Sequence, residues 1–549
     1  MNQISEKTQK LIKQYQIWYQ ALQPKKDESA IHVDEVASAV ASFYEKIRGV
    51  VEWREEHLLR RAAIERILKR RLFLQTTADG MAESFVFELI RGGHFPNDRI
   101  PETKIEEVKK ALNKYLFILE NSPHPPREKM KVHLYNWLLD IAACEIEEIL
   151  SSPIKERALI EYMTELMKEK IKVVEGIVVY QGILKEEKET QVYIACQRAL
   201  FKLDSSIISY HLLRKRYVDW QKVDEPCSSP RFANARVLEE TQLKKIAADI
   251  YSIWDSIEKD LKHPLTEKFY KICEQYDTPY LILGDILSQN PTEPHKSLSQ
   301  PETLEGLIKQ AYQTRFKRLK VRMRRAAIFI TISIFVTKML LAFAIEIPFD
   351  KYILGGFNYE VLAINILIPP FLMFLLVLTI RPPRKENLNI VIMETMKIVY
   401  EKDTMDVCEI KSPRKKGFIL NFVINLFYLF TFLVSFGIII WGLNKLNFGV
   451  LSIIIFLMFF SLIAFAGVKI RERAKELQVL PEKTGFLTFL TDSLSLPFLR
   501  LGRWLSHQWL KYNIVLIFIT ALIDMPFQVF VEFLEQWRTF LTEKKEEIH

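Results

Sequence analysis

The sequence lacks the short motifs that mark the common hydrolases and nucleotide-binding enzymes. It contains no HExxH, no GxSxG and no GxxxxGK[ST], the spacings that hold a catalytic zinc, a serine nucleophile or the phosphates of a nucleotide. Glycine is scarce, at 17 of 549 residues, although α/β enzymes that cradle phosphate need glycine-rich turns. We therefore predict no catalytic site and no cofactor, and we disfavour an enzyme.

The sequence also has few cysteines and no apolar run at its N-terminus. The five cysteines form no CxxC pair, which argues against a disulfide framework and a zinc site and for reduced thiols in a cytosolic compartment. The first thirteen residues contain no apolar run, so we expect no cleavable signal peptide and expect the first membrane span to direct insertion. The cysteines are Cys144, Cys196, Cys227, Cys273 and Cys408.

Positive charge is concentrated in the second half of the chain. Residues 1–300 contain 45 Lys and Arg against 46 Asp and Glu, and residues 301–549 contain 31 against 21. The excess lies beside long apolar runs, where it is typical of membrane topology signals rather than of a nucleic-acid surface. We therefore expect the lipid bilayer, and no nucleic acid, as a partner.

Residues 1–300 have the apolar periodicity of packed helices. Apolar residues between Val33 and Val51, and again between Ile105 and Leu119, recur at i, i+3, i+4 and i+7, which predicts buried helical faces. The segment 132–149 repeats this pattern with one acidic residue, Glu145, on the apolar face. A lone strand-like stretch at 177–183 does not predict a sheet. The sequence predicts an all-α cytoplasmic domain over 1–300, followed by a basic juxtamembrane linker over 301–325.

A basic run within this domain has two interpretations. It can bind phosphate, RNA or lipid headgroups, or it can be a salt-bridged helix face, because glutamates stand close by in sequence. We favour the salt-bridged face. The run consists of Arg60, Arg61, Arg66, Lys69, Arg70 and Arg71.

Four apolar runs are long enough to cross a bilayer. Each has about 20 residues or more, which at about 1.5 Å per residue spans a hydrocarbon core of about 30 Å. The flanks alternate in basic content: seven Lys and Arg between Arg315 and Arg325, one in 348–360, nine in 381–416, one in 444–448, and four after the last run. This alternation predicts that the N-terminal domain is cytoplasmic, in a multi-pass protein of the plasma or inner membrane. The runs are Ala326–Ile347, Val361–Ile380, Gly417–Leu443 and Gly449–Val468.

These runs define a polytopic helical membrane domain. We predict a first hairpin over 326–385, a cytoplasmic connecting segment over 386–416, a second hairpin over 417–470, and amphipathic helices with a charged tail over 471–549. Residues 486–512 predict a helix lying in the headgroups, with Arg500, Arg503, Trp504 and Trp509 as anchors. The alternative is a helix packed on the N-terminal domain.

A fifth apolar segment, 514–533, carries Asp524, Pro526 and Glu532. These residues suit an amphipathic helix better than a span, so we predict four spans and a cytoplasmic C-terminus, with five spans as the alternative. A single cysteine at Thr542, probed in intact cells with an impermeant maleimide, distinguishes the two.

Polar side chains interrupt the predicted spans. Lys338 lies about 18 Å into the first span, and a lysine at that depth needs a polar partner. Asn425 on the third span is within its predicted reach, Asn421 shares that face, and Asn365 on the second span is a further candidate. The cluster predicts either interhelical hydrogen bonding, which we favour, or an ion or substrate pathway. If the partners are all neutral, Lys338→Leu is expected to leave the protein inserted and no less stable.

A proline pair, Pro369 and Pro370, is a candidate break in the second span, because it leaves the carbonyls of Asn365 and Ile366 without helical donors. Broken helices line binding sites in transporters, although a proline more often only kinks a span.

Two function hypotheses follow. The first is a membrane-anchored interaction or scaffold protein that binds a protein partner on its helical domain. The second is a channel or transporter with a cytosolic regulatory domain, for which a bundle of four spans predicts a homo-oligomer. A water-accessible cavity lined by Lys338 and Asn425 would favour transport, and a dry, closed cluster would favour the scaffold.

Overall fold

The computed structural model describes most of the chain. The described residues are 4–22, 29–33, 56–74, 81–123, 128–174, 185–217, 220, 235–292, 294–352, 359–379, 386–400, 408–411, 417–479, 486–511, 533, 537 and 540. The predicted helix between Val33 and Val51, apart from Val33 itself, lies outside them. So do the strand-like stretch 177–183, Cys227, and the fifth apolar segment apart from Phe533, and the predictions on those segments remain predictions.

The chain folds into two compact units. The first comprises Met1–Ser5, Thr278–Thr404 and Pro413–Ile514, and the second comprises Glu6–Asp277, Met405–Ser412 and Val515–His549. The unit boundary at Asp277 precedes the boundary that the sequence predicted at residue 300. Helices α13 and α14 belong to the first unit apart from the first residue of α13.

The second unit is a helical domain with one short sheet. Its elements are α1 (Glu6–Ala21), α3 (Glu56–Leu74), α4 (Met81–Arg91), α5 (Thr103–Asn121), α6 (Glu128–Ser151), α7 (Ile154–Lys170), β1 (Ile171–Val174), α8 (Lys185–Phe201), α9 (Ser205–Arg216), α11 (Ala235–Leu261), α12 (Thr266–Gln275) and β2 (Cys408–Lys411). One buried cluster of this unit draws on α3, α4, α5, α6, α8, α9 and α11, with Phe85 and Trp220 among its largest side chains.

The acidic residue on the apolar face of α6 is neutralised inside this core. Lys114 Nζ donates to Glu145 Oε1 at 2.5 Å, and the Tyr115 hydroxyl donates to Glu145 Oε2 at 2.5 Å. The lysine and the carboxylate are both almost fully buried. Because each charge faces an opposite charge, a buried Glu145 is compatible with the helical core that the periodicity predicted.

The strand pair joins segments that are far apart in the sequence. β2 lies between α18 and α19 in the chain, and it pairs in parallel with β1, with Lys172 opposite Glu409. The sequence predicted only a connecting segment over 386–416, without a strand. Four-residue strands are too short to give a clear alternating pattern, which is why this sheet was missed.

The first unit contains the long apolar helices. Its elements are α13 (Asp277–Gln289), α14 (Pro294–Ser299), α15 (Pro301–Leu341), the π-helix η1 (Ala342–Glu346), α16 (Ile347–Tyr352), α17 (Tyr359–Thr379), α18 (Glu386–Tyr400), α19 (Phe418–Lys445), α20 (Val450–Ala474) and α21 (Phe486–Lys511). The predicted linker 301–325 is the first part of α15, which continues without a break into the first apolar run.

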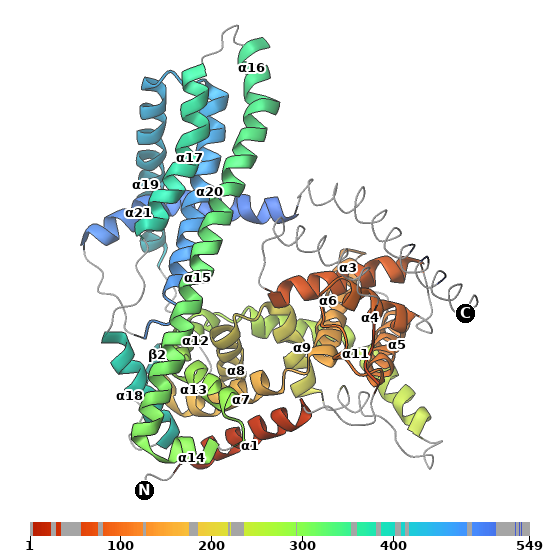
Figure 1. Cartoon of the computed structure of the whole chain (residues 1–549). Coiled ribbons are helices and arrows are strands. Elements are labelled where there is room, and N and C mark those ends of the chain that lie inside the picture. The colour runs from red at the N-terminus through yellow and green to blue at the C-terminus, as the bar shows by residue number, and fades with distance from the viewer. Residues whose placement is uncertain are drawn as a thin grey trace, which may run out of the picture. The chain divides into compact units, whose positions relative to one another are not determined.

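Three helices in the described part of the chain are long and apolar enough to cross a membrane: Pro301–Phe349, Phe418–Lys445 and Val450–Ala474. The apolar part of α17, Leu362–Leu378, is shorter. Figure 1 shows α15, α17, α19 and α20 side by side as a bundle, with α21 running across it. Large apolar side chains are exposed along α19, on a scale that soluble proteins rarely show, and this exposure is compatible with a unit that lies in a membrane. The exposed set includes Phe418, Ile419, Phe422, Phe430, Leu433, Ile438 and Trp441.

The base of the first unit is held by a buried amide. Asn387 on α18 donates to the Tyr312 hydroxyl at 3.1 Å and to the Leu477 carbonyl at 2.5 Å, and its own carbonyl accepts from the Val479 N–H at 2.9 Å. Asn387 thus ties together α15, α18 and the segment after α20. Because it is buried, each of these bonds satisfies a group that water does not reach.

Candidate functional site

Three polar side chains meet inside the apolar bundle. Lys338 Nζ on α15 donates to Glu346 Oε1 at 2.5 Å, and Asn365 Nδ2 on α17 donates to Glu346 Oε2 at 2.6 Å. The carboxylate therefore links the first and second apolar helices. We call Lys338, Glu346 and Asn365 the polar triad.

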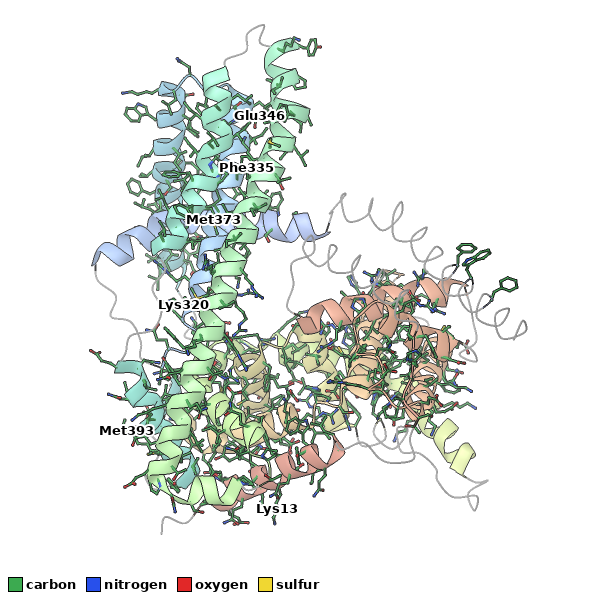
Figure 2. The ribbon with its side chains drawn as sticks, in the orientation of Figure 1. Lys13, Lys320, Phe335, Glu346, Met373 and Met393 are labelled. Carbon is green, nitrogen blue, oxygen red and sulfur yellow. The ribbon has the colours of Figure 1, made fainter. Side chains whose placement is uncertain are left out.

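The π-helix brings the ion pair together. Glu346 lies eight residues after Lys338, which in an α-helix would set it about 12 Å along the axis and about 80° around it. The five-residue π-helix η1 ends at Glu346. Its wider turn rotates the chain less per residue than an α-helix does, so Glu346 lies closer to the face of Lys338. In Figure 2, Glu346 lies far along this helical run from Lys320.

The polar triad is closed to solvent. The exposed fractions are 0% for Lys338, 1% for Glu346 and 1% for Asn365. The Lys338 ammonium also lies 5.5 Å from the centroid of the Phe459 ring on α20, at a distance that allows a cation–π interaction. Within the described residues, Asn365 Oδ1 has no hydrogen-bond partner. The cavity that lies along α15 includes none of these three residues.

Lys338 and Asn365 were predicted from the sequence as members of a polar cluster, whereas Glu346 was not. A signal was present, because Glu346 is the only carboxylate in the first apolar run. Glu346 lies at the C-terminal end of that run, where a carboxylate is ordinarily expected to face water. Only the fold shows that its side chain points into the bundle.

The two asparagines of the third apolar helix lie elsewhere. Asn421 and Asn425 are both exposed on α19. The predicted contact between Lys338 and Asn425 is therefore wrong. Equal depth in the membrane does not bring side chains together when the helices turn different faces to each other.

The proline pair does not interrupt its helix. Pro369 and Pro370 lie inside α17, which continues through them, so the predicted break is absent. Each proline removes one backbone donor, and the remaining hydrogen bonds hold the helix. The residue whose carbonyl loses its donor to Pro369 is Asn365, so the weakened turn coincides with the polar triad.

Helix α21 packs on α19 and α20. Phe498 is buried between Phe436 of α19 and Phe460 of α20, with ring centroids 4.6 and 4.8 Å away. At Gly502 the two backbones approach so closely that a Cβ atom would lie 2.1 Å from the Ser461 carbonyl oxygen of α20. Glycine at this crossing is therefore a packing requirement.

The predicted interfacial anchors lie outside this packed face. Arg503 and Trp504 are exposed. The Arg500 guanidinium is exposed as well and lies 4.2 Å from the centroid of the Tyr428 ring of α19. The side chain of Trp509 is outside the described part of the structure.

In the second unit, the basic run pairs with acidic residues of several helices. Arg60 donates to Glu147 at 3.2 Å, Arg61 binds Asp204, Lys69 binds Glu65, and Arg70 and Arg71 both bind Glu88. Most of these partners are distant in sequence. The pairing agrees with a salt-bridged face, and it holds α3 against α4, α6 and the start of α9.

The second unit also has a polar pocket. It measures about 640 Å³ and is bordered by α1, α7, α8 and α9. Six cationic and two acidic side chains line it, and four of the cations also pair with glutamates outside the lining. The cations are Lys7, Lys10, Arg157, Lys168, Arg214 and Lys215, and the acids are Glu161 and Glu165.

A buried network forms the base of this polar pocket. His211 contacts Gln197 through Nδ1 and Glu148 through Nε2, both at 2.5 Å, and Arg157 and Arg214 also bind Glu148. Burial alone would raise the pKa of Glu148, but the hydrogen bond and charge of His211 and the charge of Arg157 outweigh it and lower that pKa. Glu148 therefore stays charged and fixes the two arginines at the pocket wall.

Comparison with known proteins gives no relative. No protein-family model, no curated protein and no solved structure matches this chain. The function must therefore be argued from the sites themselves.

Proposed function

We propose that this chain is a multi-pass membrane-anchored interaction protein. Its helical second unit lies in the cytoplasm and binds a partner, and its first unit is a membrane anchor. The observation that carries the proposal is the closed polar triad. A transport pathway needs polar groups that water or solute can reach, whereas Lys338, Glu346 and Asn365 are 0%, 1% and 1% exposed.

Two independent features support a cytoplasmic second unit. Basic residues alternate along the flanks of the apolar runs, as the positive-inside rule requires. In addition, β2 comes from the connecting segment between α17 and α19 and pairs with β1 of the second unit. Two segments that share a sheet must lie on the same side of a membrane, because the sheet's polar backbone cannot pass through lipid.

We propose α17 as the fourth span. Its apolar part, Leu362–Leu378, covers about 26 Å as a helix, at the lower limit for a span. It packs between α15 and α20, which are both long enough to cross, and with four spans both ends of the bundle return to the cytoplasmic side.

The polar pocket is the proposed partner site. Four of its cations already pair with glutamates. Lys10 and Lys215 are the remaining lining cations among the described residues, and they favour a partner that presents carboxylates, such as an acidic peptide segment. Lys10, Gln14 and Lys215 are exposed at this pocket, so they are available to an incoming chain.

Site-specific crosslinking in native membranes tests this proposal. A photoreactive amino acid at Gln14 is expected to give one discrete adduct, and the same residue at Lys110, exposed on α5, is expected to give none. The variant K10E/K215E should abolish the Gln14 adduct. The control K110E/K245E makes the same charge change at exposed sites away from the pocket and should leave it intact.

An equal loss of adduct in both double variants would contradict the pocket as the partner site.

The second candidate is a channel or transporter. Asn365 Oδ1 is buried without a hydrogen-bond partner among the described residues, next to an ion pair and a proline-weakened turn, which is the kind of site where a pathway opens in transporters. Ion flux measured in liposomes containing the full-length protein separates the two candidates. Flux that disappears in the variant E346Q, while the protein remains inserted, would replace the anchor with a transporter.

A further inference from the structure

A groove runs along the outer surface of the apolar bundle. It measures about 520 Å³ and lies between α15, α17 and the end of α20. It extends from Phe316, below the first apolar run, to Ile332 and Phe374 within the bundle. We call it the juxtamembrane groove.

The sequence of α15 explains its shape. Lys320, Arg324, Ile328 and Ile332 follow one another at intervals of four residues, so they share one helical face. Ala327 is buried at the base of this face, and its small side chain leaves the space that the groove occupies. Phe374 and Leu378 of α17 form the opposite wall.

The two ends of the groove differ in chemistry. Lys320 and Arg324 are exposed at one end, immediately before the apolar run, and among the described residues no acidic side chain lines the groove. From Ala327 onward the lining is apolar apart from Thr331. A cationic end at the membrane boundary joined to an apolar slot within it matches a lipid that has an anionic headgroup and an acyl chain.

We propose that the juxtamembrane groove binds an anionic phospholipid of the leaflet that faces the second unit. The phosphate accepts charge-assisted hydrogen bonds from Arg324 and Lys320, and one acyl chain lies along Ile328, Ile332 and Phe374. The distance from Arg324 to Ile332 along the helix is about 12 Å, which matches the upper part of an acyl chain. The proposal depends on the membrane association of the first unit and not on the partner that the second unit binds.

Lipid titration of the purified full-length protein, followed by native mass spectrometry, tests the proposal. Dioleoylphosphatidylglycerol is expected to bind about tenfold more tightly than dioleoylphosphatidylcholine, because its headgroup is net anionic, whereas the choline cation of phosphatidylcholine offsets the phosphate and is repelled by Lys320 and Arg324. The variant K320Q/R324Q should remove this preference while still binding both lipids. The control K317Q/R325Q removes the same charge from exposed residues of the same helix that do not line the groove and should keep the preference.

A further variant tests the apolar part. Thr331→Trp places a large ring in the slot and should weaken binding of both lipids, with elution from a sizing column unchanged. Equal affinity of the wild type for both lipids would overturn the proposal. So would an equal loss of preference in both glutamine double variants, since that would assign the effect to the whole basic run rather than to the groove.

Discussion

The ion pair in the polar triad gives the sharpest prediction. Lys338→Leu removes the ammonium and leaves the Glu346 carboxylate buried beside Asn365. The sequence alone predicted that this substitution would be tolerated, on the assumption of neutral partners. Because the partner is a carboxylate, we expect the opposite, a loss of about 3–5 kcal/mol in the free energy of unfolding.

The magnitude follows from two opposing terms. With Nζ and Oε1 2.5 Å apart, Coulomb attraction at an effective dielectric constant of about 20 is about 7 kcal/mol. Desolvation costs several kcal/mol for each ion and largely offsets this gain. A single substitution loses the attraction but keeps the desolvation cost of the remaining ion, whereas Lys338→Leu combined with Glu346→Leu removes both terms. We therefore expect the double variant to be within about 1–2 kcal/mol of the wild type.

Asn365 adds an internal check. Asn365→Val loses a hydrogen bond to a charged group, which destabilises the protein by about 1.5–3 kcal/mol. The same substitution removes a buried oxygen that has no hydrogen-bond partner among the described residues, which stabilises the protein by about 1–3 kcal/mol. The two effects should nearly cancel, so this variant is expected to be close to the wild type.

Reversible unfolding in mixed micelles, followed by tryptophan fluorescence, measures all four proteins. Lys351→Leu is the control, because Lys351 is exposed on α16 and its loss is expected to cost less than about 0.5 kcal/mol. The reasoning is refuted if Lys338→Leu behaves like Lys351→Leu, or if the double variant is no more stable than the single one.

Three further predictions concern other parts of the molecule. Burial, followed by the charge of Glu65, raises the pKa of Asp140 to about 6. A carboxyl group with a raised pKa contributes stability at low pH that is lost as the pH rises through about 4 to 6. Asp140→Asn should therefore be more stable than the wild type at pH 7.5 by on the order of 2 kcal/mol, and equal to it near pH 4. The pair Lys172→Cys and Glu409→Cys, opposite each other in β1 and β2, should form a disulfide on mild oxidation when the native cysteines are replaced, detected as a gel shift that neither single variant gives. Gly502→Ala should lower the unfolding midpoint, equivalent to about 1–3 kcal/mol, because its Cβ would meet a backbone oxygen at 2.1 Å, whereas Gly442→Ala on α19, with open space around it, should not.

Each of these has a clear contrary result. An equal stability difference between Asp140→Asn and the wild type at both pH values would show that Asp140 does not titrate in this range. Absence of the cross-link would contradict the β1–β2 pairing and, with it, the support for a shared side of the membrane. A midpoint for Gly502→Ala equal to that of Gly442→Ala would contradict the close crossing of α20 and α21.

Local patterns determined the helical class and the distribution of apolar surface. Apolar spacing within one helix depends only on neighbouring residues, so the amphipathic helices at 105–119 and 132–149 could be predicted. The length of an apolar run can likewise be counted directly in the sequence, and three of the four predicted runs form helices long and apolar enough to cross a membrane. Residues 486–512 were predicted as one amphipathic helix, and α21 covers Phe486–Lys511.

Only the tertiary structure decided which polar groups meet. The sequence placed Lys338 and Asn425 at compatible depths, but the rotation of each helix about its axis depends on packing, and α19 turns its asparagines outward. Glu346 reaches Lys338 because a π-helix turns it inward, and β1 finds β2 more than two hundred residues away. Such contacts join residues that are remote in sequence, so no local period records them. They form because burying these polar groups together costs less than burying them apart.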